Sequence, residues 1–170
     1  MKRFATIALS FFALVVCATG AGKAAATGSW GPWESTYQGP ITAPAGVVCP
    51  FEVTAEPVME NLRIRYHYDG AGNIDGYEVT GPLVARVTNT ENGKSVRRNL
   101  ASKGTVFFNP DGSYDAVVDG NFLLFFLDGD NPAHELLLLT GRTVLHGSPT
   151  GEKTLVSAKG RSENLCETLA

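Results

Sequence analysis

Residue types that commonly carry chemistry are scarce in this chain. Its 170 residues include three cysteines, three histidines and two methionines. The histidines His67, His134 and His146 lie far apart, without the close spacing typical of zinc ligands. No Gly-x-Ser-x-Gly nucleophile motif is present. We therefore expect a non-catalytic protein with no metal and no other cofactor.

Long apolar runs are also lacking. The longest is the thirteen-residue run Phe4–Val16, and the longest later one, Phe122–Leu127, has six residues. A bilayer needs about 20 apolar residues, so we expect no membrane span. Lys2-Arg3 before the run and Ala24-Ala25-Ala26 after it are typical of a signal peptide over residues 1–26. Lipid anchoring at Cys17 is the alternative, although Val16 is larger than the residue that usually precedes such a cysteine.

Removal of residues 1–26 changes the charge balance of the chain. The mature protein keeps 11 basic and all 17 acidic residues, a net charge of −6. This excess argues against nucleic acid or an anionic membrane as partner. The remaining length suits a single β-domain over residues 47–170, preceded by an arm over residues 27–46.

Only two cysteines, Cys49 and Cys166, remain after cleavage. In an oxidising compartment they form one natural pair, and the alternative is two separate buried thiols. Closing so long a loop would stabilise the fold by roughly 4–5 kcal/mol in the chain-entropy model.

The arm is rich in Gly, Pro, Ser and Thr and has no periodicity, so we expect it to be irregular. Trp30, Trp33 and Tyr37 are scattered along it. These aromatic residues either cover a hydrophobic seam or bind a partner.

From Val48 onward, short runs rich in Val, Phe, Tyr and Thr alternate with turn residues, which predicts an all-β fold. Leu62–Tyr68 alternates apolar and polar residues strictly. Pairing it with residues 75–79 so that Tyr66 faces Tyr77 and Arg65 faces Glu78 keeps the apolar residues on one face. This register also sets Ile64 opposite Val79.

Two further turns mark hairpins. Asn109-Pro110-Asp111-Gly112-Ser113 joins Thr105–Phe108 to Tyr114–Val118, and Asn92-Gly93 joins Leu83–Thr88 to Ser95–Leu100. With closing strands at 144–146 and 155–159, we expect an antiparallel meander of about nine or ten strands. A β-barrel is favoured over a β-sandwich because no long crossover is needed. A short helical turn is expected near Ser162–Leu169.

Two segments, Phe122–Leu127 and Leu136–Leu139, leave neither strand face polar. Such strands must be covered on both faces by core, by a partner or by an apolar ligand. The candidate ligand contacts are Phe122, Leu124, Phe126, Leu137 and Leu139.

A polar cluster is expected on the other face of Leu62–Tyr68, where Arg63, Arg65 and His67 would lie near Glu78. It forms either a solvated face or, inside a barrel, an anion-binding lining. Asp128-Gly129-Asp130-Asn131 resembles a calcium loop only weakly, because Ala133 and Leu139 occupy the positions that need Gly and Glu. A polar turn explains it more simply.

Several motifs in order, Cys49-Pro50-Phe51-Glu52-Val53, residues 87–96, Asn109–Ser113, Thr140-Gly141-Arg142 and Asn164-Leu165-Cys166, resemble those of a family of small, uncharacterised secreted actinobacterial proteins. The similarity spans roughly Val47 to Leu169. It implies export, a single β-domain and a Cys49–Cys166 bond, and it implies no activity.

The sequence thus favours a secreted protein that holds a small apolar ligand in a β-barrel. The alternative is a structural or interaction module that associates through residues 122–127 and 136–139. Third is an enzyme that uses Arg63, Arg65, His67 and Glu78 on a polar interior, which would fail if Tyr66 and Ile64 face inward instead.

Overall fold

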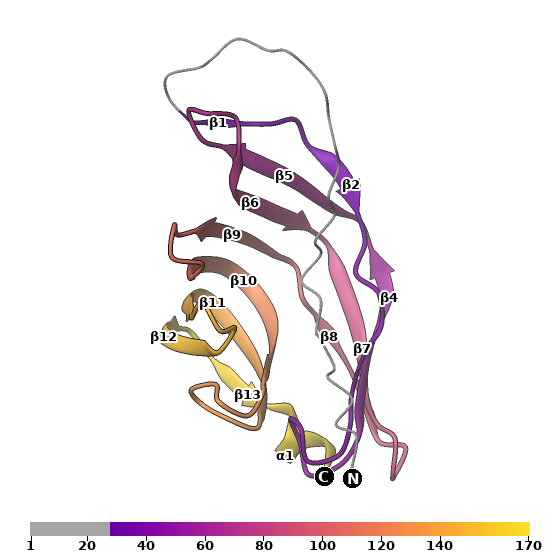
Figure 1. Cartoon of the computed structure of the whole chain (residues 1–170). Coiled ribbons are helices and arrows are strands. Elements are labelled where there is room, and N and C mark those ends of the chain that lie inside the picture. The colour runs from indigo at the N-terminus through magenta and orange to yellow at the C-terminus, as the bar shows by residue number, and fades with distance from the viewer. Residues whose placement is uncertain (1–27) are drawn as a thin grey trace, which may run out of the picture.

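The computed structural model describes residues 28–170 and is built almost entirely of antiparallel strands (Figure 1). Within these residues no helix is long and apolar enough to cross a membrane. The elements are β1 (Ser29–Trp30), β2 (Glu34–Thr36), β3 (Ile41–Ala43), β4 (Val53–Glu60), β5 (Leu62–Tyr68), β6 (Ile74–Gly81), β7 (Leu83–Asn89), β8 (Ser95–Asn99), β9 (Ser102–Phe108), β10 (Tyr114–Phe126), β11 (Glu135–Gly147), β12 (Lys153–Lys159), β13 (Ser162–Asn164) and α1 (Leu165–Leu169).

The strands form two sheets. The nine-stranded sheet has the order β1-β5-β6-β9-β10-β11-β12, with β2 also on β5 and β13 also on β11. The four-stranded sheet has the order β3-β4-β7-β8. The two are continuous in the chain, because β4 runs into β5, β6 into β7 and β8 into β9 with one or two residues between them.

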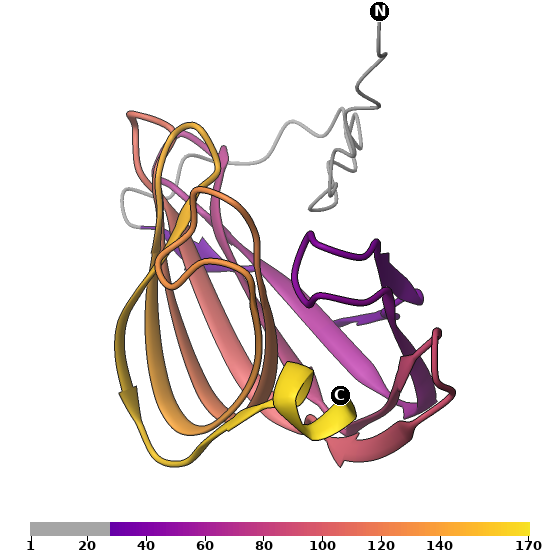
Figure 2. The ribbon, with the colours of Figure 1, turned by 90° about the horizontal axis from the view of Figure 1, so that it is seen from below.

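All these transitions lie on one line across the sheet, which we call the crease. Hydrogen bonds carry the strand ladder across it, from Asn61 N to Pro82 O (2.9 Å) and from Asn121 N to Ala101 O (3.0 Å). Beyond the crease the sheet divides into two branches (Figures 1 and 2). One is the four-stranded sheet, and the other is the hairpin branch, made of residues 121–126, 135–140, β13 and α1.

Glycines allow the hairpin branch to bend at the crease. Gly120 and Gly141 face each other across β10 and β11, with φ of +120° and +80°. A Cβ on Gly141 would lie 2.1 Å from Lys159 O, and one on Gly120 would lie 2.6 Å from Ala101 O. Neither the backbone conformation nor the space at this point suits a side chain.

The larger core fills the wedge-shaped space between the two branches, which we call the wedge. Helix α1 lies between the branches (Figure 2). Cys49 and Cys166 are bonded across this wedge, with their Cα atoms 5.3 Å apart, which confirms the predicted disulfide. The four-stranded sheet contributes Val53, Ala55, Ala85 and Val87, the hairpin branch contributes Leu136, Leu138, Leu165 and Leu169, and Leu123 and Phe125 pack against them.

A smaller core lies on the opposite face of the hairpin branch, where the β10–β11 hairpin curves back toward β12. The loop over residues 127–134 meets β12, since Leu155 N donates to Asn131 O and Asn131 N donates to Lys153 O. Asp130, with only 2% of its side chain exposed, accepts from Leu127 N and Lys153 N and pairs with Lys153 Nζ at 2.7 Å. This buried ion pair holds the curved hairpin closed.

The all-β antiparallel fold and the C-terminal helical turn are confirmed. The β5–β6 register is the one predicted, with Tyr66 opposite Tyr77 and Arg65 opposite Glu78. Both turn predictions are also correct, and Gly112 and Gly93 take φ of +87° and +76°. Neither sheet closes on itself over residues 28–170, since the strand order ends at β1 and β12 in one sheet and at β3 and β8 in the other. The choice between barrel and sandwich therefore stays open. One expectation needs correction. The arm is not wholly irregular, since β1, β2 and β3 pair at sheet edges.

Candidate functional site

The sheet on the β5 side of the crease presents two faces with different chemistry. Its cross-strand register aligns Tyr66, Tyr77, Val106 and Ala116 on one face. We call this the tyrosine face and include Phe108 and its partner Tyr114. The other face carries Arg65, His67, Phe107, Asp115 and His146, with Trp30 of β1 opposite His67. We call it the arm face.

The tyrosine face is an aromatic surface that is partly open. The rings of Tyr77 and Phe108 lie 5.9 Å apart, and Phe108 is 46% exposed. Burial, with smaller contributions from neighbouring Tyr114 and Tyr66, raises the pKa of Tyr77 to about 12. The Tyr77 hydroxyl therefore stays protonated in apolar surroundings near two other phenols.

Tyr114 lies where the tyrosine face meets the smaller core of the hairpin branch. A Cβ on Gly147 would lie 1.9 Å from the Tyr114 ring, so the ring packs directly on the glycine of the neighbouring strand. Burial raises the pKa of Tyr114 as well, and the nearby carboxylate of Asp130 adds to this effect. The open aromatic surface thus ends at the loop that closes the smaller core.

The residues predicted to contact an apolar ligand lie mainly inside that core. Leu124, Phe126, Leu137 and Leu139 are buried against Ala116 and Leu145, and Phe122 is half-buried beside them. Their neighbours Leu123, Phe125, Leu136 and Leu138 face the larger core. The two-faced apolar pattern is therefore explained by two cores of the same chain, one on each side of the hairpin branch. Within these segments Leu136–Leu139 are buried, while Phe122, Leu123, Phe125 and Leu127 are half-buried.

On the arm face, Arg65 is the centre of the cluster predicted from the sequence. Its guanidinium lies 4.6 Å from the ring centroids of both Trp30 and Trp33, and Arg63 lies 5.4 Å from Trp33. Arg65 also pairs with Glu78 at 3.0 Å, and Lys103 pairs with the other Glu78 oxygen at 3.2 Å. The two indoles shield the Arg65 guanidinium from water, which strengthens its pairing with Glu78.

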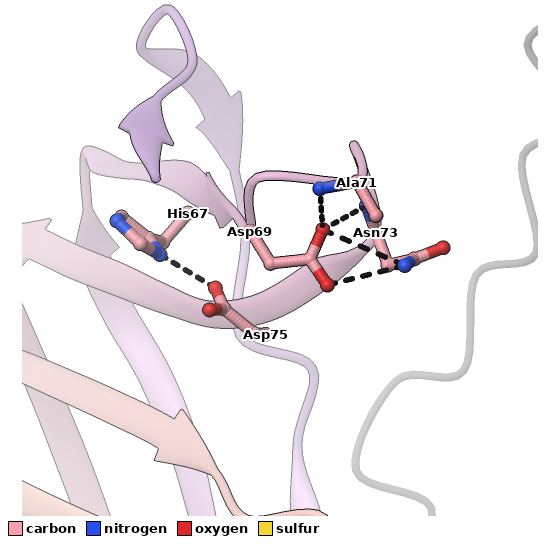
Figure 3. A network of polar contacts seen from close by, with 5 residues as sticks. All are labelled: His67, Asp69, Ala71, Asn73 and Asp75. Carbon is pink, nitrogen blue, oxygen red and sulfur yellow. Dashed lines mark hydrogen bonds and ion pairs between the residues drawn. The ribbon is translucent and has the colours of Figure 1, made fainter. Parts of the chain in front are cut away.

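His67 is held at the turn end of the same cluster (Figure 3). Its Nδ1 lies 2.5 Å from Asp75 Oδ1, and its ring contacts Trp30 edge-on. In the adjoining turn, Asp69 accepts hydrogen bonds from Ala71 N and Asn73 N (Figure 3). The Asn73 side chain, followed by its backbone N–H, holds the pKa of Asp69 below its ordinary value. This carboxylate shapes the β5–β6 turn.

The structure therefore brings Arg63, Arg65, His67 and Glu78 together. They form neither a fully solvated face nor the lining of a barrel, the two arrangements expected from the sequence. Glu78 is 4% exposed beneath the arm instead of lying in solvent or lining a barrel. Because neither sheet closes over residues 28–170, the cluster lines no enclosed interior of the kind that the enzyme hypothesis required. Trp30 and Trp33 cover cations, where a hydrophobic seam was expected.

Sequence reasoning missed Phe107, Phe108 and Asp115. Alternation along 105–108 already placed the two phenylalanines on opposite faces, but nothing in the pattern showed that both would remain exposed. In the segment 128–135, Asp130 uses both oxygens on the chain itself, as the polar-turn interpretation requires.

Comparison of the chain with protein-family models, with curated proteins and with solved structures finds no match. The function must therefore be argued from these two faces.

Proposed function

We propose that the mature protein is an exported, non-catalytic binding protein that takes a small apolar or aromatic molecule on the tyrosine face. The observation that carries this proposal is the exposure of Phe108, 46%, beside the half-buried Tyr77. Large apolar side chains are expensive to leave in water, and clustered ones commonly mark binding surfaces. The ligand would lie against Phe108 and its neighbour Tyr114, which packs against the smaller core.

The chemistry of this face suits a planar, weakly polar ligand. Phe108 and Tyr77 offer rings for stacking, and the phenols of Tyr66 and Tyr77 add hydrogen-bonding groups at fixed places. Ligand sites typically combine such an apolar lining with a few polar groups that set orientation.

Export remains part of the proposal. The signal peptide and Cys17 lie outside the described residues, and the Cys49–Cys166 bond supports an oxidising compartment. The resemblance to small secreted actinobacterial proteins stays a prediction. The interaction module is the less favoured alternative, because its proposed strands contribute most of their side chains to the two cores of the chain.

Fluorescence titration of residues 27–170 with N-phenylnaphthylamine, a neutral apolar probe, tests the proposal. We expect saturable binding by the native protein and at least about tenfold weaker binding by Phe108→Ser. Phe107→Ser is the matched control, since Phe107 is 42% exposed on the other face of the same strand. Absence of saturable binding, or equal effects of the two substitutions, would overturn the proposal.

A further inference from the structure

A row of side chains on the arm face crosses the sheet from β5 to β11 and is independent of the tyrosine face. In cross-strand register it contains His67, Gly76, Phe107, Asp115 and His146. The Phe107 ring lies over Gly76, where an added Cβ would come within 2.7 Å of it. Trp30 and His67 hold the ring from the side, at centroid distances of 6.0 and 5.4 Å. Phe107 is therefore positioned, yet 42% exposed.

Next to this ring, polar groups are fixed by one another. His146 Nδ1 lies 2.9 Å from Asp115 Oδ1, and Asn109 Nδ2 donates to Asp115 Oδ2 at 3.2 Å. Two same-face positions nearer the crease, Arg142 donates to Asp119 at 3.1 Å. All four members of these two ion pairs are about half exposed, so they keep donors and acceptors available to a ligand. His146 and Asn109, in that order, hold the pKa of Asp115 below its ordinary value, which keeps it an acceptor.

The way these groups are already paired narrows the class of ligand. Asp119 is paired with Arg142, and Asp115 is hydrogen-bonded to His146 and Asn109. A charged ligand would have to break one of these pairs. A purely apolar ligand would desolvate them without replacing their contacts with water. A neutral molecule rich in hydroxyl groups can instead bond to both members of each pair.

A sugar chain has these properties. The C–H face of a pyranose ring stacks on an aromatic ring, and its hydroxyls donate to carboxylates and accept from imidazole and guanidinium groups. Phe107 on β9 and His146 on β11 are two strand spacings apart, about 10 Å. That distance matches a disaccharide laid across the strands. The half-buried Val117 and Val144 leave a low surface between the polar pairs.

From this arrangement we propose that the arm face between Phe107 and Arg142 binds a neutral oligosaccharide, with Phe107 as the stacking platform and Asp115 as the principal hydroxyl acceptor. This site is separate from the apolar site proposed above, since the two lie on opposite faces of β9.

Isothermal titration calorimetry of residues 27–170 with cellohexaose, chitohexaose, mannohexaose and xylohexaose tests this inference. At least one is expected to bind, and Phe107→Ser and Asp115→Asn should each weaken that binding by about tenfold or more. Asp115→Asn keeps the side-chain shape, so it separates a lost acceptor from a folding defect, and near-ultraviolet circular dichroism checks the fold of both variants.

Phe108→Ser is the reciprocal control and should leave oligosaccharide affinity unchanged. If none of the four sugars binds at millimolar concentration, or if both substitutions leave the affinity of a bound sugar unaltered, the inference is wrong. If Phe108→Ser loses probe binding but keeps sugar binding, the two sites bind their ligands independently.

Discussion

Phe107 and Phe108 are neighbours in the chain, yet their rings lie on opposite faces of β9: one contacts Trp30 and the other contacts Tyr77. Strand geometry alone produces this separation, because successive side chains point to opposite faces. Both rings remain more than two-fifths exposed. One short strand therefore divides the two proposed binding surfaces, and each phenylalanine provides the control for the other.

The crease makes a specific demand on Gly141. We expect Gly141→Ala to reduce the free energy of unfolding by more than Gly93→Ala, although φ is similar at the two positions, +80° and +76°. The left-handed backbone costs either variant about 1–2 kcal/mol. Only at Gly141 would the new Cβ also meet a backbone oxygen, whereas nothing lies within 4 Å of one at Gly93. Urea denaturation measures both; equal losses would mean that the crease tolerates a side chain.

The loop that closes the smaller core depends on Asp130. Asp130→Asn should destabilise the protein by about 3–5 kcal/mol, because it leaves the charge of the largely buried Lys153 without its partner. Asp128→Asn, two residues away with a side chain 96% exposed, should change stability little. Thermal unfolding of the two variants provides the measurement. A similar midpoint for both would show that the ion pair is not what holds the curved hairpin closed.

Reduction of the Cys49–Cys166 bond opens a link across 117 positions. The loss of stability should approach roughly 4–5 kcal/mol if chain entropy dominates. A Cys49→Ala, Cys166→Ala double variant should unfold at the midpoint of the reduced native protein and should not respond to reductant. An unchanged midpoint on reduction of the native protein would contradict the pairing.

Alkaline pH should weaken the fold through Tyr77. Its pKa in the folded protein is about 12 against an ordinary value of 10.0, so the folded state retains this proton longer than the unfolded state. The contribution is complete below pH 10 and is lost as pH rises toward about 12. Tyr77→Phe should flatten the fall in unfolding free energy over this interval. An ultraviolet titration that shows every tyrosine of the native protein ionising near the ordinary value would refute the assignment.

Acidification should weaken the Arg98–Glu163 ion pair, which links β8 to β13. Arg98 donates to Glu163 through Nε and Nη2 and holds the pKa of Glu163 below its ordinary value of 4.5. The link therefore contributes fully above that value and is lost as pH falls through the lower, folded-state pKa. Glu163→Gln should cost about 1 kcal/mol or less at neutral pH, because the pair is partly exposed. The difference from the native protein should vanish in strong acid, and a constant difference would exclude a charge effect.

Local patterns predicted the parts of the fold that depend on neighbouring residues. The alternation in Leu62–Tyr68 was enough to obtain the register with β6, because any slip by one residue would mix the two faces. Asn109–Ser113 likewise predicted its hairpin from turn chemistry. The disulfide prediction followed from there being only two cysteines beyond the predicted signal peptide.

The crease could not be predicted in this way. Gly120 and Gly141 look like turn glycines in the sequence, and their role as bends depends on their facing each other across two strands. For the same reason, Leu124 and Leu137 suggested ligand contacts, since an apolar ligand and a second core require the same residues. The stacking of Arg65 between two arm tryptophans is a long-range contact that composition does not encode.

The wedge core joins Val53 and Val87 to Leu165 and Leu169. A chain that leaves a ribosome or a membrane pore from its N-terminal end therefore cannot complete this core until residues 165–169 have emerged. The apolar faces of the first strands therefore stay exposed to water until that point. The Cys49–Cys166 disulfide likewise can form only after Cys166 has emerged. Together with the proposed export, this order of assembly would keep the chain unfolded during passage and leave its folding to the destination compartment.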